Sequence, residues 1–320
     1  MFEAENLRRP IVIASAGRSG STLYYRLLAR HRDLAWLSTY NQMLPSLTWV
    51  SLLSRLYARP SLARFRDERY FPKPFSPYRF WARYLADVAR HDRPLVATDV
   101  AGEVIDPLRR TISRIVRYQG KPRFLMKVTG WARMGYFDRV FPDALFIYLR
   151  RDPVAVVESW VRAGWLNVTG AVGSEQWEWG EVPQAYRRLW SELGGGRLLS
   201  AAVKTQLDID DLRRNARMFP SRCFELSYED LIADPVHWLR RTATFCGLEW
   251  YEEFESIVRS TIVHNHTSRW RRFLSEEDGR RLREFFTRTA ALGTEAGVVR
   301  IAGTDGRVER SKDTASRVMA

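Results

Sequence analysis

The chain is poor in cysteine and has no apolar run long enough to cross a membrane. Its 320 residues include two cysteines, Cys223 and Cys246. Two are too few for a disulfide framework, so we expect buried free thiols in a reducing, cytoplasmic location. The longest apolar stretch, around residues 43–56, is interrupted by Pro45 and by serines, so it cannot span a bilayer. The first ten residues are mixed and charged, which does not fit a signal peptide.

The same apolar stretch contains Trp49 and is followed by Tyr57. Three roles fit this composition: a core or lid helix, a wall of a substrate cleft, or a surface that makes peripheral contact with a membrane. We favour the core or lid helix, and the other two roles stay open.

Acidic side chains are outnumbered in this chain. Asp and Glu number 37 against 51 Lys and Arg, which gives a formal net charge of +14. Such a surplus favours anionic ligands or membrane headgroups, or it reflects an arginine-rich surface. No recognition helix, zinc-finger spacing or RNA-binding signature accompanies the scattered basic residues, so we expect no nucleic-acid partner. We also expect no metal, because His264 and His266 lack a surrounding ligand cluster.

Internal repeats are also missing, and 320 residues suffice for one domain with a full core. Apolar β-branched segments alternate with helical patterns, which predicts an α/β fold: a parallel sheet flanked by helices. We assign residues 1–302 to this domain and residues 303–320 to a flexible polar tail. The expected strands are 11–15, 95–99, 123–128, 144–150 and 223–228. The expected helices are 21–31, 78–91, 103–117, 152–163, 184–193, 208–217, 236–246 and 276–291.

The most informative segment is the first expected strand and the loop after it. A glycine-containing loop between a strand and a helix is the layout of a phosphate cradle, because loop amides and the helix N-terminus present partial positive charge. The segment therefore predicts a bound nucleotide or another phosphorylated ligand. The loop residues are Gly17, Arg18, Ser19, Gly20, Ser21 and Thr22.

The cation of this loop is an arginine inside it. A Walker-type loop ends in Gly-Lys-Ser/Thr, and its lysine reaches the terminal phosphates of a nucleoside triphosphate. Here Gly20 is followed by Ser21, and Arg18 supplies the positive charge. The loop resembles the 5′-phosphosulfate loop of sulfotransferases, with Gly17 where that family usually has proline.

A second segment strengthens the resemblance. Arg151 follows an expected strand and precedes Asp152 and Pro153, where the proline favours a helix start. Ser159 follows Arg151 by eight residues, about two helical turns, so both side chains can face one phosphate. The pair resembles the 3′-phosphate motif of sulfotransferases, an arginine at a strand end and a serine on the next helix.

Two more segments resemble the same family. Tyr228, in the Tyr-Glu-Asp-Leu sequence at residues 228–231, matches its strand-end motif. Residues 267–271 resemble its C-terminal donor-binding loop, and they include Ser268, Arg269 and Trp270. The resemblance covers about residues 10–290 and is nearest to the carbohydrate and tyrosyl-protein branches.

The resemblance implies a reaction and a donor. A sulfuryl group would pass from 3′-phosphoadenylyl sulfate (PAPS) to a hydroxyl of a glycan, glycolipid or secondary metabolite, without a metal. The loop with Arg18 would bind the 5′-phosphosulfate, and Arg151 with Ser159 would hold the 3′-phosphate. Arg269 and Trp270 would close over the donor. Positioning and charge neutralisation would supply the catalysis.

Lys127 ends an expected strand that should lie beside the first strand. The carboxyl edge of an open α/β sheet is where ligands bind. The resemblance to the tyrosyl-protein branch implies that Lys127 contacts the transferred group, and that Arg133 is another basic residue of the site.

The general base is not indicated by any motif. Many relatives carry a glutamate shortly after the first helix, but residues 36–42 contain no carboxylate. Asp99, at the end of an expected strand, is our first candidate for the base. Glu103, His264 and His266 are alternatives, and so is catalysis by positioning alone.

Two other functions stay open. A P-loop kinase fits the loop, but the Gly-Lys-Ser/Thr ending is missing and the pair of Arg151 and Ser159 is unexplained. A catalytically silent nucleotide-binding protein fits the missing glutamate. The sequence does not indicate the acceptor or the oligomeric state.

Overall fold

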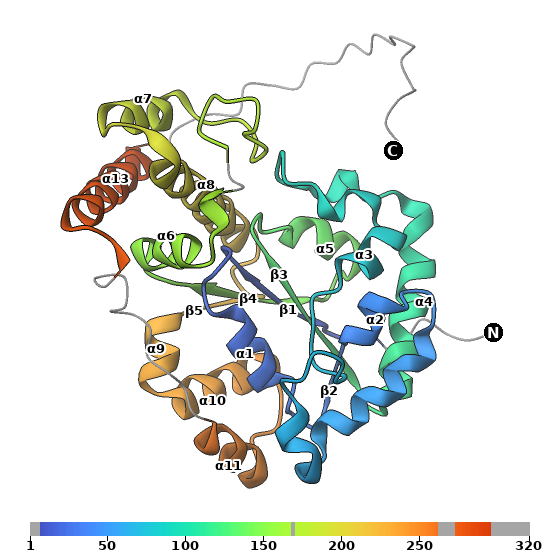
Figure 1. Ribbon diagram of the computed structural model, residues 1–320. Coiled ribbons are helices and arrows are strands. Elements are labelled where there is room, and N and C mark those ends of the chain that lie inside the picture. The colour runs from blue at the N-terminus through green and yellow to red at the C-terminus, as the bar shows by residue number, and fades with distance from the viewer. Residues whose placement is uncertain (1–6, 168–169, 262–272, 296–320) are drawn as a thin grey trace.

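Five parallel strands form one sheet at the centre of the computed structural model, which describes residues 7–167, 170–261 and 273–295 (Figure 1). The spatial order is β2-β3-β1-β4-β5, so the first strand lies in the middle. This confirms the predicted α/β class with a parallel sheet. The strands are β1 (Ile11–Ser15), β2 (Leu34–Trp36), β3 (Arg123–Thr129), β4 (Leu145–Arg150) and β5 (Cys223–Ser227).

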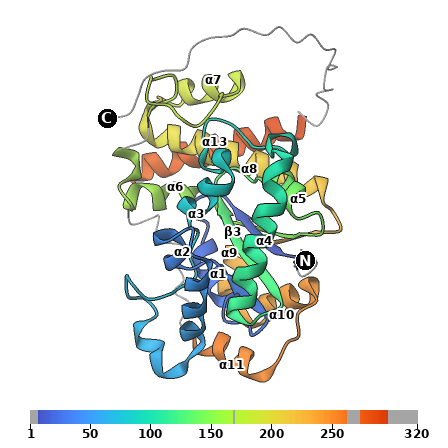
Figure 2. The same cartoon turned by 90° about the vertical axis from the view of Figure 1, so that its right-hand side faces the viewer.

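Helices cover both faces of the sheet, and the alternation of side chains along β1 shows how. Val12 and Ala14 pack into one apolar cluster with α3, α4 and α5, whereas Ile11 and Ile13 pack into another with α1, α10 and α11. All four side chains have no exposed surface, as expected for a strand between two layers. Figure 2, seen from the side of α4, shows that helix lying across the sheet.

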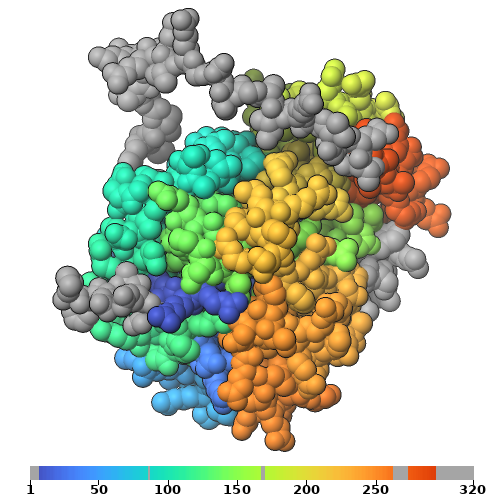
Figure 3. Space-filling view, turned by 180° about the vertical axis from the view of Figure 1, so that it is seen from behind, coloured from blue at the N-terminus to red at the C-terminus, as the bar shows by residue number. Residues whose placement is uncertain are grey.

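A third apolar cluster joins α6, α7, α8 and α13 at one end of the sheet. Seen from behind, the segments of the first half of the chain (blue to green) and of the second half (gold to red) occupy opposite sides of the molecule (Figure 3). None of the described helices is long and apolar enough to cross a bilayer. The α-helices are α1 (Ser21–Leu28), α2 (Thr39–Met43), α3 (Tyr78–Tyr84), α4 (Gly102–Gln119), α5 (Met134–Val140), α6 (Pro153–Arg162), α7 (Gln184–Glu192), α8 (Gly196–Met218), α9 (Tyr228–Ala233), α10 (Pro235–Cys246), α11 (Glu252–Ser260) and α13 (Glu276–Glu295). The 3₁₀ helices are η2 (Thr48–Ala58), η3 (Pro60–Phe65), η4 (Ala86–Ala89), η5 (Ala97–Asp99) and η6 (Trp165–Asn167).

Four of the five expected strands are present, and the expectation at residues 95–99 was wrong. That segment ends in the 3₁₀ helix η5. Asp99 is responsible, because its carboxylate accepts a hydrogen bond from the Val96 amide at 2.8 Å and so offers the backbone a local partner in place of a strand.

The sheet edge is formed instead by β2, which the sequence analysis missed. Gln119 at the end of α4 completes this edge. Its side-chain amide accepts from the Trp36 N–H at 3.1 Å and donates to the Trp36 carbonyl at 2.6 Å. These are the two backbone groups that a further strand would otherwise pair with.

The expected helices are present with different bounds. The helix expected at 208–217 begins at Gly196 and forms the long α8, whereas the one expected at 78–91 is divided into α3 and η4. Cys223 and Cys246 are free thiols, as expected, and burial raises the pKa of each to about 12. The proposed tail at 303–320 lies outside the described residues.

Candidate active site

The carboxyl ends of β1, β3 and β4 and the residues that follow β5 meet at one cavity of about 660 Å³. The strand register produces this meeting point: Ser15 on β1 is paired with Thr129 on β3, and Arg150 on β4 is paired with Ser227 on β5. Each strand therefore ends at a similar height, and the loops that follow can face a common ligand.

The loop between β1 and α1 forms one wall of the cavity. Arg18 and Gly20 have left-handed backbone conformations, with φ of 68° and 82°. These turns bring the chain to the N-terminus of α1, where Gly20 is the cap and Ser21 the first helical residue. The first amides of a helix lack intrahelical acceptors and carry partial positive charge, so this wall suits an anion.

Gly20 permits a close approach of the loop to Tyr228. A β-carbon at position 20 would lie 2.2 Å from the Tyr228 ring, closer than atoms can pack. The guanidinium of Arg151 lies 4.7 Å from the centroid of the same ring. Tyr228, at the start of α9, thus supports both the loop and the arginine.

The two predicted phosphate motifs are joined by direct hydrogen bonds. Arg18 donates from Nε to the Ser159 hydroxyl at 3.0 Å, and Arg151 donates from Nη1 to the Arg18 carbonyl at 2.8 Å. The Arg18 guanidinium also lies 5.2 Å from the centroid of the Trp165 ring. Residues separated by more than 130 positions in the sequence therefore form one cluster.

The cluster is rich in positive charge. Burial, followed by the positive charges of Arg162 and Arg151, lowers the pKa of Arg18. Arg162 is paired with the buried carboxylate of Glu158, from Nε to Oε1 at 3.1 Å. The like charges of Arg18, Arg151 and Arg162 repel one another, and an anionic ligand at this wall would reduce that repulsion.

Arg151 presents a guanidinium edge without a protein partner. Its Nε and Nη2 are buried and have no hydrogen-bond partner among the described residues, while Nη1 is used by the loop. Two adjacent N–H groups on a planar guanidinium match two oxygens of a phosphate. This edge is therefore the best-defined anion-binding group in the cavity.

Lys127 lies where the sequence analysis placed it, on β3 beside β1. It is paired in register with Ile13, and its Nζ donates to the Thr22 hydroxyl at 3.1 Å. Burial, with a smaller contribution from the positive charge of Arg26, lowers the pKa of Lys127 to about 8. The ammonium group is therefore charged near neutral pH and close to losing its proton above it.

The opposite end of the cavity was not predicted from the sequence. Lys204 and Asp208 on α8 form a buried ion pair, and the Lys204 ammonium lies 4.8 Å and 5.0 Å from the ring centroids of Trp131 and Trp179. His91 contacts this group through its ring, 5.5 Å from that of Trp179. An ion pair spaced i, i+4 resembles an exposed helix face in a sequence, so no sequence signal separated it from the surface charges.

Several predicted residues take other roles. Asp99 is not among the described residues that line the cavity, and Arg93 holds its carboxylate through two hydrogen bonds of 2.7 and 2.8 Å. This pairing lowers the pKa of Asp99 to about 2. Asp99, our first candidate, is therefore not suited to act as the general base. Arg133 lines the cavity but donates to the carbonyls of Trp131 and Arg90. The remaining predicted residues lie outside the described part of the chain: His264, His266, Ser268, Arg269 and Trp270.

Comparisons with known proteins agree with this geometry. A family model described as the sulfotransferase family matches residues 10–252. Omega-hydroxy-beta-dihydromenaquinone-9 sulfotransferase Stf3 from Mycobacterium bovis, and the protein of the same name from Mycobacterium tuberculosis, are each 28% identical over 185 residues. The match covers 54% of this chain and 42% of theirs, so the chain matches less than half the length of these curated relatives.

A solved structure supports the fold. Sulfotransferase STF9 from Mycobacterium avium superposes with a TM-score of 0.53 at 16% identity, over 89% of this chain and 77% of that one. At this identity the similarity concerns the arrangement of the chain and not the details of the site.

We expect Gly20→Ala to destabilise the protein by about 2–5 kcal/mol. The substitution adds the cost of a left-handed alanine, about 1–2 kcal/mol, to the cost of the overlap with Tyr228, about 1–3 kcal/mol. Urea denaturation measures the effect, and adding Tyr228→Ala should recover only the part due to overlap. Gly102→Ala is the matched control, because nothing lies within 4 Å of a β-carbon there. Equal stability of Gly20→Ala and Gly102→Ala would contradict the packing described above.

Proposed function

The chain belongs to the sulfotransferase family, and we propose that it transfers a sulfuryl group from PAPS to a hydroxyl group of an acceptor. The unpartnered edge of Arg151, beside the loop that carries Arg18, is the observation that supports this donor most directly. PAPS has a phosphate at the 3′ position and a phosphosulfate at the 5′ position, so it requires two neighbouring anion sites. The 3′-phosphate would occupy the edge of Arg151 near Ser159, and the 5′-phosphosulfate would occupy the loop at residues 17–22.

The transfer itself requires charge neutralisation at two places. The acceptor oxygen forms a bond to sulfur while the bond from sulfur to the bridging oxygen of the 5′-phosphate breaks. The acceptor loses its proton to a base, and 3′,5′-adenosine diphosphate (PAP) leaves with the added negative charge. Arg18 and Lys127, with the amides at the start of α1, would stabilise the charge on the leaving phosphate and on the sulfuryl oxygens.

The acceptor would bind at the aromatic end of the cavity. Four tryptophans contribute to its lining, and Trp160 has a buried indole N–H without a hydrogen-bond partner among the described residues. Aromatic faces stack on sugar rings or on apolar groups, and a free N–H can donate to an acceptor oxygen. A glycan, a glycolipid or a secondary metabolite would satisfy these contacts. The four are Trp131, Trp160, Trp165 and Trp179.

His91 is the proposed general base. Among the described residues that line the cavity, His91 and Asp208 are the histidine and the carboxylate that could accept a proton. Asp208 is held by Lys204, whereas His91 is accessible. Burial, followed by the positive charges of Arg133 and Lys204, lowers the pKa of His91. The imidazole is therefore neutral at pH 7 and able to take the acceptor's proton.

We expect Arg151→Ala to weaken PAP binding by about 1.5–3 kcal/mol, the free energy of a charge-assisted hydrogen bond to a phosphate. Isothermal titration calorimetry should show no such loss for adenosine 5′-phosphate, which lacks the 3′-phosphate. Arg150→Ala is the matched control, because Arg150 is paired with Glu225 at 3.1 Å and does not line the cavity among the described residues. An equal loss for both ligands would contradict the 3′-phosphate assignment. Tighter binding of ATP than of PAP by the unmodified protein would contradict the proposed donor.

PAP binding should also depend on pH through Lys127. The free site has a Lys127 pKa of about 8, and a bound anion favours the charged form, so binding above pH 8 takes up a proton. Affinity should be level below pH 8 and fall by up to about tenfold per pH unit above it. Lys127→Arg should remove this fall because a guanidinium stays charged, and Lys127→Ala should lower turnover more than donor affinity. The same pH profile in Lys127→Arg and the unmodified protein would exclude Lys127 as the titrating group.

His91→Ala should lower kcat by about 10²–10⁴-fold, the usual contribution of a general base. PAP affinity should remain unchanged, because the ring lies at the aromatic end of the cavity. Turnover of labelled PAPS, with the first acceptor found in a screen of hydroxyl compounds, provides the measurement. Glu103→Gln is the control for an exposed carboxylate outside the cavity. A large loss in Asp208→Asn with none in His91→Ala would move the base to Asp208.

A further inference from the structure

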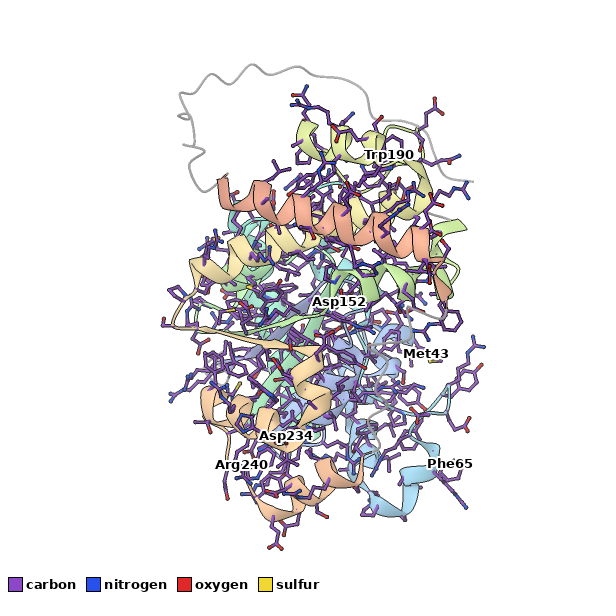
Figure 4. The ribbon with its side chains drawn as sticks, turned by 90° about the vertical axis from the view of Figure 1, so that its left-hand side faces the viewer. Met43, Phe65, Asp152, Trp190, Asp234 and Arg240 are labelled. Atoms are coloured by element: carbon purple, nitrogen blue, oxygen red, sulfur yellow. The ribbon has the colours of Figure 1, made fainter. Side chains whose placement is uncertain are left out.

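Exposed apolar side chains are concentrated in one part of the chain. Of the 14 large hydrophobic side chains that are exposed in the described residues, ten lie between positions 43 and 78. Met43 and Phe65 lie at the same edge of the molecule in Figure 4, one on α2 and one at the end of η3. We refer to these ten residues as the apolar surface. They are Met43, Leu44, Leu47, Trp49, Leu52, Leu53, Phe65, Tyr70, Phe75 and Tyr78.

The helix η2 places its serines inward and several of its large apolar residues outward. In a 3₁₀ helix every third residue lies on the same row. Trp49 and Leu52 share a row in which their exposures are 54% and 46%, whereas Ser51 and Ser54 share a row with exposures of 0% and 4%. Ser51 is used in the interior, since its hydroxyl accepts from the Asn41 amide at 3.1 Å. The sequence analysis favoured a core or lid helix here, and the outcome is divided: Val50 and Tyr57 are buried, whereas Trp49, Leu52 and Leu53 are exposed.

This arrangement stabilises the isolated protein poorly. Each exposed tryptophan or leucine forgoes the free energy that burial would supply. A concentration of exposed apolar side chains in one segment marks a surface that contacts another apolar phase or partner.

The charge of the same segment identifies the partner. Residues 43–79 contain seven Lys and Arg and two Asp and Glu, a net charge of +5. One of the two acids, Asp67, is paired with Arg26 at 3.0 Å. A second copy of the chain would bring two positively charged segments together, which is unfavourable. An anionic bilayer offers both an apolar interior and negative headgroups.

We propose that the apolar surface docks on an anionic lipid bilayer. Trp49, Leu52 and Leu53 enter the boundary between headgroups and acyl chains, and the exposed arginines around them, such as Arg59 and Arg64, contact the headgroups. This inference is independent of the proposed sulfuryl transfer, since it uses neither the donor nor the base.

The docking surface continues to the cavity. Tyr78 is 43% exposed as part of the apolar surface, and it also lines the cavity. The amide of Arg79 donates to the Gln42 side chain at 3.1 Å, which joins α3 to α2. The cavity therefore opens beside the surface that we assign to the membrane.

Vesicle flotation of the purified full chain tests the proposal. We expect the protein to float with vesicles of equal parts phosphatidylcholine and phosphatidylglycerol, and to float weakly with phosphatidylcholine alone. Replacing Trp49, Leu52 and Leu53 by serine should lower partitioning at least tenfold, because these side chains would no longer bury apolar surface in the bilayer. Arg59→Glu combined with Arg64→Glu should abolish the preference for phosphatidylglycerol. Met218→Ser is the matched control, since Met218 is 60% exposed on α8, outside the apolar surface.

Three further results decide the outcome. An unchanged midpoint of urea denaturation in the triple serine variant would show that a loss of flotation does not come from unfolding. Equal flotation of the triple variant and Met218→Ser would overturn the proposal. A dimer seen by light scattering that becomes a monomer in the triple variant would also overturn it, and would assign the surface to a second copy of the chain.

Discussion

The loop after β1 depends on side chains that arrive from two other strands. Its backbone turns through left-handed conformations at Arg18 and Gly20. Glycine adopts such a conformation readily, whereas the one at Arg18 needs support from the surrounding structure. Arg151, from the end of β4, holds the loop by its carbonyl, and Tyr228, from the end of β5, packs against its glycine. The site is therefore complete only when β1, β4 and β5 are in register. Folding of the sheet and assembly of the anion site are one event.

The arginine side chains of the same cluster repel one another as long as no anion lies between them. Burial, followed by the positive charges of Arg162 and Arg151, lowers the pKa of Arg18, and the carboxylate of Glu158 offsets part of this effect. Repulsion among fixed like charges is relieved when an anion enters, so part of the binding free energy comes from the protein and not from new contacts alone. Parallel strands hold these charges in place and prevent them from moving apart.

Much of the fold could be predicted because it depends on local patterns. The apolar runs of β1 and β4 are buried along almost their whole length, and the loop at 17–22 and the pair of Arg151 and Ser159 have short, specific spacings. The edge strand β2 could not be predicted, since it has only three residues and the backbone groups of Trp36 pair with the side chain of Gln119, 83 positions away. The strand expected at residues 95–99 does not form, because the Asp99 carboxylate accepts a hydrogen bond from the Val96 amide in place of the backbone hydrogen bonds of a strand.

The aromatic end of the site escaped prediction for a related reason. Lys204 and Asp208 belong to a helix that is buried on nearly all sides, and only the tertiary structure distinguishes them from solvated charges. Trp49 shows the reverse: we favoured a core or lid helix for its segment, but the structure leaves its side chain 54% exposed.

The division of the cavity into a charged end and an aromatic end has a consequence for how this chain can diversify. The groups proposed to hold the donor are fixed by hydrogen bonds to backbone and by strand register, so they tolerate little change. Trp131 and Trp179 at the other end come from separate segments, and replacing either of them leaves the contacts of Arg18 and Arg151 intact. Descendants of such a gene can therefore acquire new acceptors by a few substitutions while they keep the donor site that we propose.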